Sequence, residues 1–162
     1  MRPTIVLALL SLLILPAACD GDSADKPYIE FAGGGFVFNY RLAEVTYGFV
    51  GKRVRKIPPG TLLEAHFEDP AGGPAIVVTE TAREGALQYS FQTPPVQGVE
   101  AEKDYGVELK LLAETDGTLL ASYSFTIRSE LGQDILPDRP LTVGPGYEAN
   151  PERVPAEPNS SQ

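Results

Sequence analysis

The single histidine of the chain, His66, is flanked at two-residue spacing by Glu64 and Glu68. Histidine can act as a general base or bind a metal ion. In a strand, side chains at i and i+2 lie on one face, about 6.6 Å apart at roughly 3.3 Å per residue. Glu64, His66 and Glu68 are therefore candidates for a carboxylate–imidazole metal site. A solvated strand face produces the same pattern. We expect this solvated face, and we expect no metal and no cofactor.

Other residue types exclude most familiar catalytic sites. One histidine excludes any site that needs two imidazoles, and the single cysteine, Cys19, excludes an intrachain disulfide, a Cys-rich zinc module and a thiol redox pair. No G-x-S-x-G motif surrounds a serine. The 22 acidic side chains leave a carboxylate-dependent glycan hydrolase open as an alternative, because many pairs could act as acid and base. We expect no catalytic residues and a non-enzymatic protein.

Four basic residues lie within five positions: Lys52, Arg53, Arg55 and Lys56. They stand out in a chain with a formal net charge of −9 and a pI near 4.6, a balance that argues against nucleic-acid binding. We place them at the end of a strand and its loop. One interpretation is a charged edge that discourages strand association. The other is a docking patch for an acidic protein, a lipid head group or a cell-wall polymer.

Two glycine-rich segments, 33–35 and 48–52, look superficially like phosphate-binding loops. Neither has the G-x-x-x-x-G-K-[ST] spacing or a following helical segment. We therefore interpret their glycines as turn and bend residues.

The N-terminus has the layout of a secretory signal. Arg2 precedes an apolar run over residues 5–15, and Pro16-Ala17-Ala18 follow it. The run is too short to cross a hydrocarbon core of about 30 Å as a stable helix.

The sequence Leu15-Pro16-Ala17-Ala18-Cys19 resembles a bacterial lipobox, although Pro16 stands three places before the cysteine where leucine is usual. The resemblance implies a signal peptide over 1–18, acylation of Cys19, and a lipidated tether over 19–27 that holds the protein on a membrane in the bacterial envelope, facing the periplasm. Asp20 resembles an inner-membrane retention signal; the outer membrane stays open. The alternatives are ordinary cleavage near Ala18, which leaves a free thiol, and an uncleaved anchor.

Alternating apolar and polar side chains predict half-buried strands between about 28 and 130. We expect one strand over 36–49, with Tyr40 and Leu42 on its buried face and a bulge near Ala43 and Glu44, and a hairpin turn at Asp116-Gly117. Further strands are expected over 63–67, 75–79, 87–91, 105–111 and 119–127. About seven short strands predict an all-β sandwich.

The segment 99–111 (VEAEKDYGVELKL) resembles the approach to, and the sixth strand of, fibronectin type III and immunoglobulin-like domains. In those families an apolar residue lies six positions before a tyrosine whose hydroxyl fastens a corner by a backbone hydrogen bond. Val99 and Tyr105 have this spacing. The usual Pro-Gly and the buried tryptophan are missing, so the resemblance leaves subtype and strand order open, and a helix over 99–114 is the structural alternative.

The sandwich is thus expected over 28–130. A Pro-rich, extended or disordered tail is expected over 131–162. Within this tail, we expect residues 141–147 to dock on the domain or on a partner. These features favour a lipid-anchored envelope module that binds another envelope protein. A carbohydrate or small-ligand module is a further alternative, disfavoured because most aromatic residues fall on predicted core faces.

Overall fold

The computed structural model describes residues 25–153. Its main strands are β1 (Ile29–Asn39), β2 (Glu44–Arg53), β3 (Leu62–Phe67), β4 (Ile76–Thr81), β5 (Gln88–Gln92), β6 (Lys103–Leu112) and β7 (Leu119–Ser129). Four short elements follow: the 3-10 helix η1 (Gln133–Ile135), β8 (Thr142–Val143), β9 (Glu148–Ala149) and the 3-10 helix η2 (Pro151–Arg153). Within this range no helix has the length and apolar character that crossing a membrane requires.

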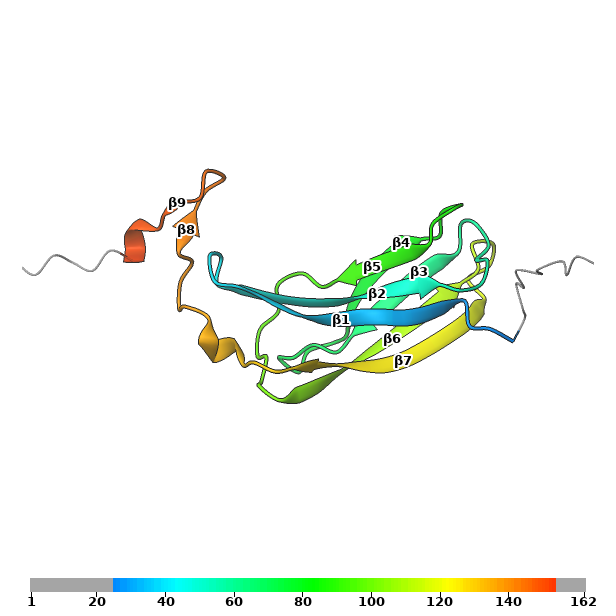
Figure 1. The fold of residues 1–162 in the computed structure, drawn as a ribbon, viewed down its shortest axis with the longest axis horizontal. Coiled ribbons are helices and arrows are strands. Elements are labelled where there is room, and N and C mark those ends of the chain that lie inside the picture. Colours follow the sequence, from blue (N-terminus) through cyan, green and yellow to red (C-terminus); the bar gives the residue numbers. More distant parts are fainter. Residues whose placement is uncertain (1–24, 154–162) are drawn as a thin grey trace, which may run out of the picture.

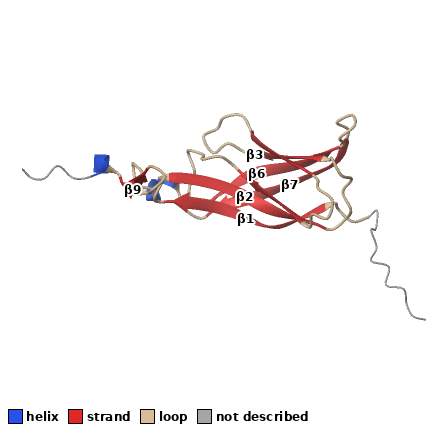
Figure 2. Cartoon of the chain, turned by 90° about the horizontal axis from the view of Figure 1, so that it is seen from above, coloured by secondary structure: helices blue, strands red, loops and turns tan. Residues whose placement is uncertain are grey.

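Two antiparallel sheets pack face to face, which confirms the predicted all-β sandwich (Figures 1 and 2). One sheet has the order β1-β2-β5 and the other β4-β3-β6-β7. In constant-type immunoglobulin domains the fourth strand belongs to the sheet of the first two strands. Here β4 instead pairs with β3 in the four-stranded sheet.

The core forms because inward positions alternate with outward ones along each strand. In β2 the inward residues Val45, Tyr47 and Phe49 are buried. Phe49 stacks on Phe91 of β5 at 4.9 Å between ring centroids and meets Phe125 of β7 edge-on at 4.8 Å. Aromatic rings therefore join the two sheets directly.

The segment predicted as one bent strand over 36–49 is two strands, β1 and β2, joined by a tight turn. The Asn39 side chain accepts hydrogen bonds from the N–H groups of Arg41 and Leu42 at 3.1 and 3.2 Å. Asparagine favours turns by such local bonds, and Ala43 completes this one with a φ of 54°. Tyr40 and Leu42 are consequently exposed in the turn, contrary to the expectation that they face the core.

The prediction of turn and bend glycines is also wrong, since Gly33–Gly35 lie inside β1, and Gly48 and Gly51 inside β2. A β-bulge between Phe31 and Gly33 shifts the register at the start of the glycine run. Backbone crowding explains Gly34, where an added Cβ would lie 2.6 Å from the Gly48 carbonyl oxygen. Gly34 and Gly48 therefore allow close strand approach and do not reverse the chain.

Residues 139–153 form a small unit that docks on the β1–β2 turn. The N–H groups of Leu141 and Thr142 donate to the Arg41 carbonyl at 2.8 and 3.2 Å. The Arg41 guanidinium lies 4.1 Å from the Tyr147 ring centroid. The expected docking of residues 141–147 on the domain is therefore present, although the chain segments involved lie about a hundred positions apart.

Candidate functional site

The four clustered basic residues lie where β2 ends. Lys52 and Arg53 are its last two residues, and Arg55 and Lys56 follow in the loop. Arg53, Arg55 and Lys56 line one shallow hollow together with Glu84, so the structure brings these three side chains together.

This basic cluster does not protect a sheet edge, because β2 is the central strand of its sheet. The Arg53 N–H donates to the Leu87 carbonyl at 2.8 Å, and the Val54 N–H donates to the Tyr28 carbonyl at 3.0 Å. The Arg55 guanidinium lies 3.5 Å from the Tyr28 ring centroid, a cation–π contact. The cluster lies at the end of the molecule where the described chain begins (Figure 1).

The outer face of the four-stranded sheet carries Glu64, His66 and Glu68, as the alternation predicts. His66 Nε2 lies 3.2 Å from Glu64 Oε2. The Glu68 carboxylate accepts the Gly106 N–H at 2.8 Å, and Glu68 lines a hollow on this face together with His66 and Glu108. Among residues 25–153, no group of three or more His, Cys, Asp or Glu side chains is placed to hold a metal ion.

Glu108 continues this polar face on β6. It accepts a hydrogen bond from the Ser122 hydroxyl at 2.8 Å and pairs with Lys110 at 3.1 Å. These two interactions, the Ser122 bond first, hold the pKa of the Glu108 carboxyl below its ordinary value. A general acid needs a raised pKa, so Glu108 is tuned in the opposite direction.

The corner implied by Val99 and Tyr105 has the following geometry. The Glu100 N–H donates to the Tyr105 hydroxyl oxygen at 2.8 Å. Val99 and the Tyr105 ring are both buried, and Tyr105 lies on β6, not on a helix. The contact fixes the approach to β6 and has a structural role.

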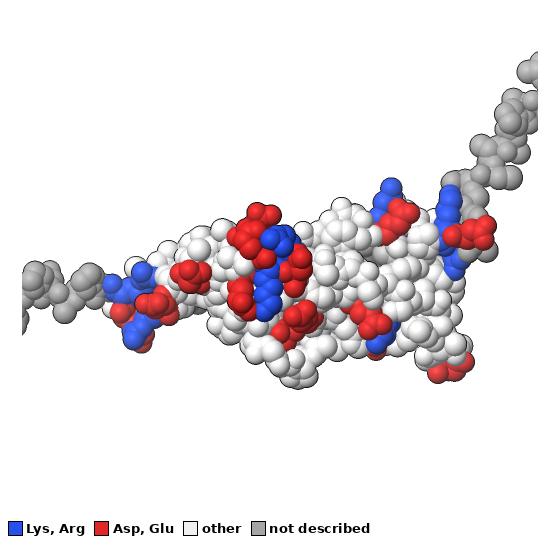
Figure 3. Space-filling view, turned by 90° about the horizontal axis from the view of Figure 1, so that it is seen from below, with Lys and Arg blue, Asp and Glu red and all other residues white. Residues whose placement is uncertain are grey.

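Charged side chains elsewhere form small mixed groups separated by uncharged surface (Figure 3). Arg128, for example, pairs with Glu102 at 2.8 Å and with Asp104 at 3.4 Å. On the face that Figure 3 shows, acidic side chains are therefore not gathered into one large patch.

Five large apolar side chains are exposed at the end of the molecule opposite the basic cluster (Figure 1). We call this set the distal pole; it comprises Tyr40, Leu42, Leu141, Val143 and Tyr147, each 37–56% exposed. Two come from the β1–β2 turn and three from the docked C-terminal unit. The alternation of apolar and polar side chains predicted that Tyr40 and Leu42 face the core. The Asn39 turn residue is the sequence signal that places them outside.

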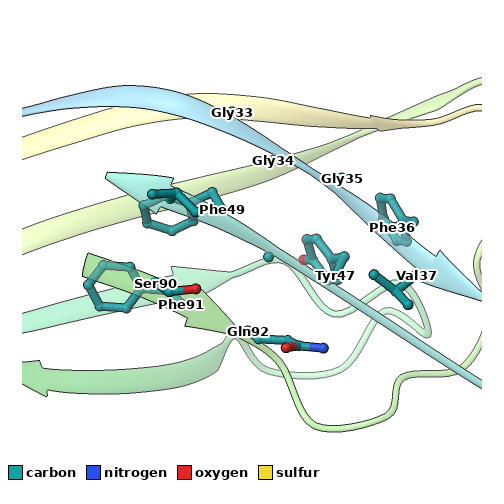
Figure 4. Close-up of a pocket in the computed structure, with 12 residues that line it drawn as sticks. Gly33, Gly34, Gly35, Phe36, Val37, Tyr47, Phe49, Ser90, Phe91 and Gln92 are labelled. Atoms are coloured by element: carbon teal, nitrogen blue, oxygen red, sulfur yellow. The ribbon is translucent and has the colours of Figure 1, made fainter. Parts of the chain in front are cut away.

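A hollow without charged lining residues lies on the outer face of the three-stranded sheet. Its lining includes Gly33–Gly35, Gly48 and Val50. Figure 4 shows the glycine run of β1 with Val37, Ser90 and Gln92. Sequence interpretation missed this hollow because it assigned the glycines to turns. Cys19, the predicted lipidation site, lies outside the described residues.

The strand order defines the class of protein as an antiparallel two-sheet β-sandwich. Comparison of the sequence with models of known protein families and with curated proteins finds no match to either.

Proposed function

We propose that the chain is a non-enzymatic, lipid-anchored module of the bacterial cell envelope that binds another envelope protein through the distal pole. The anchor part of the proposal rests on the lipobox-like sequence that ends at Cys19. Two or more acyl chains would hold a small domain stably on a membrane. The domain would then face the periplasm, and Asp20 favours the inner membrane.

The observation that carries partner binding is the exposure of the distal pole. Large apolar side chains that are exposed together at one end of a domain mark interaction sites more often than singly scattered ones do. Tyrosine suits such a surface, because its ring buries a large apolar area and its hydroxyl stays hydrated. Tyr40 and Tyr147 are 48% and 56% exposed on either side of Arg41.

The position of the distal pole fits an anchored module. The described chain begins at residue 25 at the opposite end of the sandwich (Figure 1). A lipid on Cys19 would hold that end near the bilayer and direct the distal pole away from it. The basic cluster would then lie beside the membrane surface.

We also propose a finer structural assignment, a fibronectin type III-like sandwich. The order β4-β3-β6-β7 supports it, as does the bond between the Glu100 N–H and the Tyr105 hydroxyl.

The test of partner binding is crosslinking of the tagged full chain in its native host, followed by identification of the captured proteins. Tyr147→Ala combined with Leu42→Ser should abolish capture of a specific envelope protein. Leu87→Ser is the matched control, because Leu87 is 68% exposed and lies outside the distal pole. Equal capture by both variants would contradict the proposal, and so would an empty lane from the unmodified chain.

The anchor is tested separately by Cys19→Ala. This variant should leave the membrane fraction while keeping its fold by circular dichroism. A variant that still sediments with membranes would contradict the lipidation proposal.

A further inference from the structure

The outer face of the sheet β1-β2-β5 has an uncharged centre in a highly charged chain. Strand pairing divides this centre into three cross-strand rows, which are Gly33–Val50–Ser90, Gly35–Gly48–Gln92 and Val37–Thr46. Charged side chains occur only beyond these rows, with Glu30 and Lys52 at one end and Glu44 at the other. A second molecule can cover the three rows without desolvating an unpaired charge.

Gly35 has no explanation in the fold of one molecule. An added Cβ would meet nothing within 4 Å, and its φ is not in the left-handed region. Glycine weakens a strand interior, and often marks a place where a ligand or another backbone approaches closely. The absence of a side chain at position 35 therefore points to a neighbour outside the chain.

The cross-strand rows of this face can be matched to those of a second copy. Two face-to-face sheets can be related by a two-fold axis that lies between them, perpendicular to the strands. An axis above the Gly35–Gly48 row brings Val37 of each copy over Gly33 of the other copy. Val37 is 58% exposed, so each valine would fill the space left by a missing side chain.

The same axis pairs opposite charges. Glu44 and Lys52 lie four residues on either side of Gly48 on β2, so the operation places Lys52 of each copy toward Glu44 of the other. Glu30, which is paired in register with Lys52, would face the neutral Asn39. Aligned sheets cross at about 30°, and the flexible lysine chain can span the resulting offset.

We propose that two copies of this chain associate face to face through the sheet β1-β2-β5, with a two-fold axis above the Gly35–Gly48 row. About nine residues of β1, nine of β2 and the five residues of β5, at roughly 3.3 Å per residue and about 4.8 Å between strands, cover about 360 Å² per copy. A stable interface buries about 800 Å² per partner. The dimer is therefore weak and is best detected by covalent trapping.

The first test is Gly35→Cys in the full chain, treated in intact cells of the native host with a short bis-maleimide crosslinker and analysed on a denaturing gel. Two cysteines at position 35 would face each other across the axis at the roughly 10 Å spacing of packed sheets. That spacing is beyond the reach of a disulfide but within that of the crosslinker, so a crosslinked dimer is expected. Ser124→Cys is the matched control on the outer face of the other sheet, and the unmodified chain gives the background from Cys19. A monomer, an adduct with a different protein, or an equal dimer yield from Ser124→Cys would overturn the proposal.

The second test examines the charge pairing in the Gly35→Cys chain. Lys52→Glu alone and Glu44→Lys alone should each reduce the initial rate of dimer formation by about fivefold, and the double substitution should restore it. Lys110→Glu, outside this face, should leave the rate unchanged. Single substitutions without effect, or a double substitution that does not recover, would overturn the two-fold arrangement. Neither test depends on a lipid at Cys19.

Discussion

Two tyrosine hydroxyls fasten backbone segments from inside the core. Tyr47 and Tyr105 are fully buried, with ring centroids 6.1 Å apart. The Tyr47 hydroxyl donates to the Glu68 carbonyl, and the Tyr105 hydroxyl accepts the Glu100 N–H. Burial raises the pKa of the Tyr47 hydroxyl, and the charges of Glu68 and Asp69 raise it further. Tyr47 therefore stays neutral and keeps its proton for this bond across the physiological pH range.

Tyr105→Phe should lower the free energy of unfolding by about 1 kcal/mol, because it leaves the Glu100 N–H without its partner but preserves the packing of the ring. Urea unfolding of the full chain measures this change. Tyr40→Phe is the control, since Tyr40 is 48% exposed in the β1–β2 turn and should leave the midpoint unchanged. An unaltered midpoint for Tyr105→Phe would contradict the prediction that the Tyr105 hydroxyl bond stabilises the fold.

Ser122→Ala should raise the pKa of Glu108, because the Ser122 hydroxyl bond is the main cause of its lowered value. A carboxyl whose pKa is lower when folded contributes stability above its unfolded pKa and loses it as the pH falls through the folded pKa. The variant should therefore be less stable to unfolding than the parent at neutral pH. The two stabilities should converge in strong acid, where the Glu108 carboxyl is protonated in both.

A carboxyl-selective NMR titration of Glu108 measures this pKa. Ser90→Ala, on the other sheet, is the control and should leave the Glu108 titration unchanged. A Glu108 curve that does not move in Ser122→Ala would show that Lys110 alone sets the lowered pKa.

At the scale of elements, strands with regular alternation could be predicted from the sequence, and strands built on glycine could not. The core residues of β3 and β6 alternate with polar ones, and Asp116-Gly117 lies in the connection between β6 and β7. In β1, Gly33–Gly35 supply no side chains to show which face is buried. Their role depends on strands that are distant in sequence, so local pattern could not distinguish them from turn residues.

Gly34 and Gly35 should respond oppositely to alanine, although they are neighbours in one strand. At Gly34 the new Cβ would lie 2.6 Å from the Gly48 carbonyl oxygen and 2.9 Å from Phe49 Cβ, so β1 and β2 must separate. We expect Gly34→Ala to cost about 2 kcal/mol. Gly35→Ala meets no atom within 4 Å and should be neutral, or stabilising by up to about 1 kcal/mol. Thermal unfolding of both variants decides this, and equal destabilisation would contradict it.

The candidate surfaces show the same limit of prediction. The basic cluster and the face with Glu64 and His66 are local in sequence, and their positions in strand and loop were predictable. The distal pole joins the β1–β2 turn to residues 139–153, and only the folded chain brings them together. The sequence pattern therefore indicated strand faces better than it indicated surfaces assembled from distant segments.

Across the whole molecule, the described C-terminal segment divides into two parts. The first packs on the sandwich: Leu136 is buried, the Gln133 N–H donates to the Val99 carbonyl at 2.8 Å, and the Gln133 side-chain oxygen accepts the Gly98 N–H at 2.6 Å. The second part, residues 139–153, contacts the β1–β2 turn and completes the distal pole. Stability and the proposed partner binding therefore depend on different parts of this segment.

Two truncations separate these roles. A chain that ends at Glu130 loses Leu136 and the Gln133 bonds, which should cost about 3 kcal/mol in the free energy of unfolding and lower the melting temperature by several degrees. A chain that ends at Asp138 keeps those contacts and should melt close to the full chain. It lacks Leu141, Val143 and Tyr147, however, so it should capture no envelope partner. Equal melting temperatures for the two truncated chains would show that residues 131–138 do not stabilise the sandwich. Undiminished capture of the partner by the chain that ends at Asp138 would show that the docked unit is not part of the binding surface.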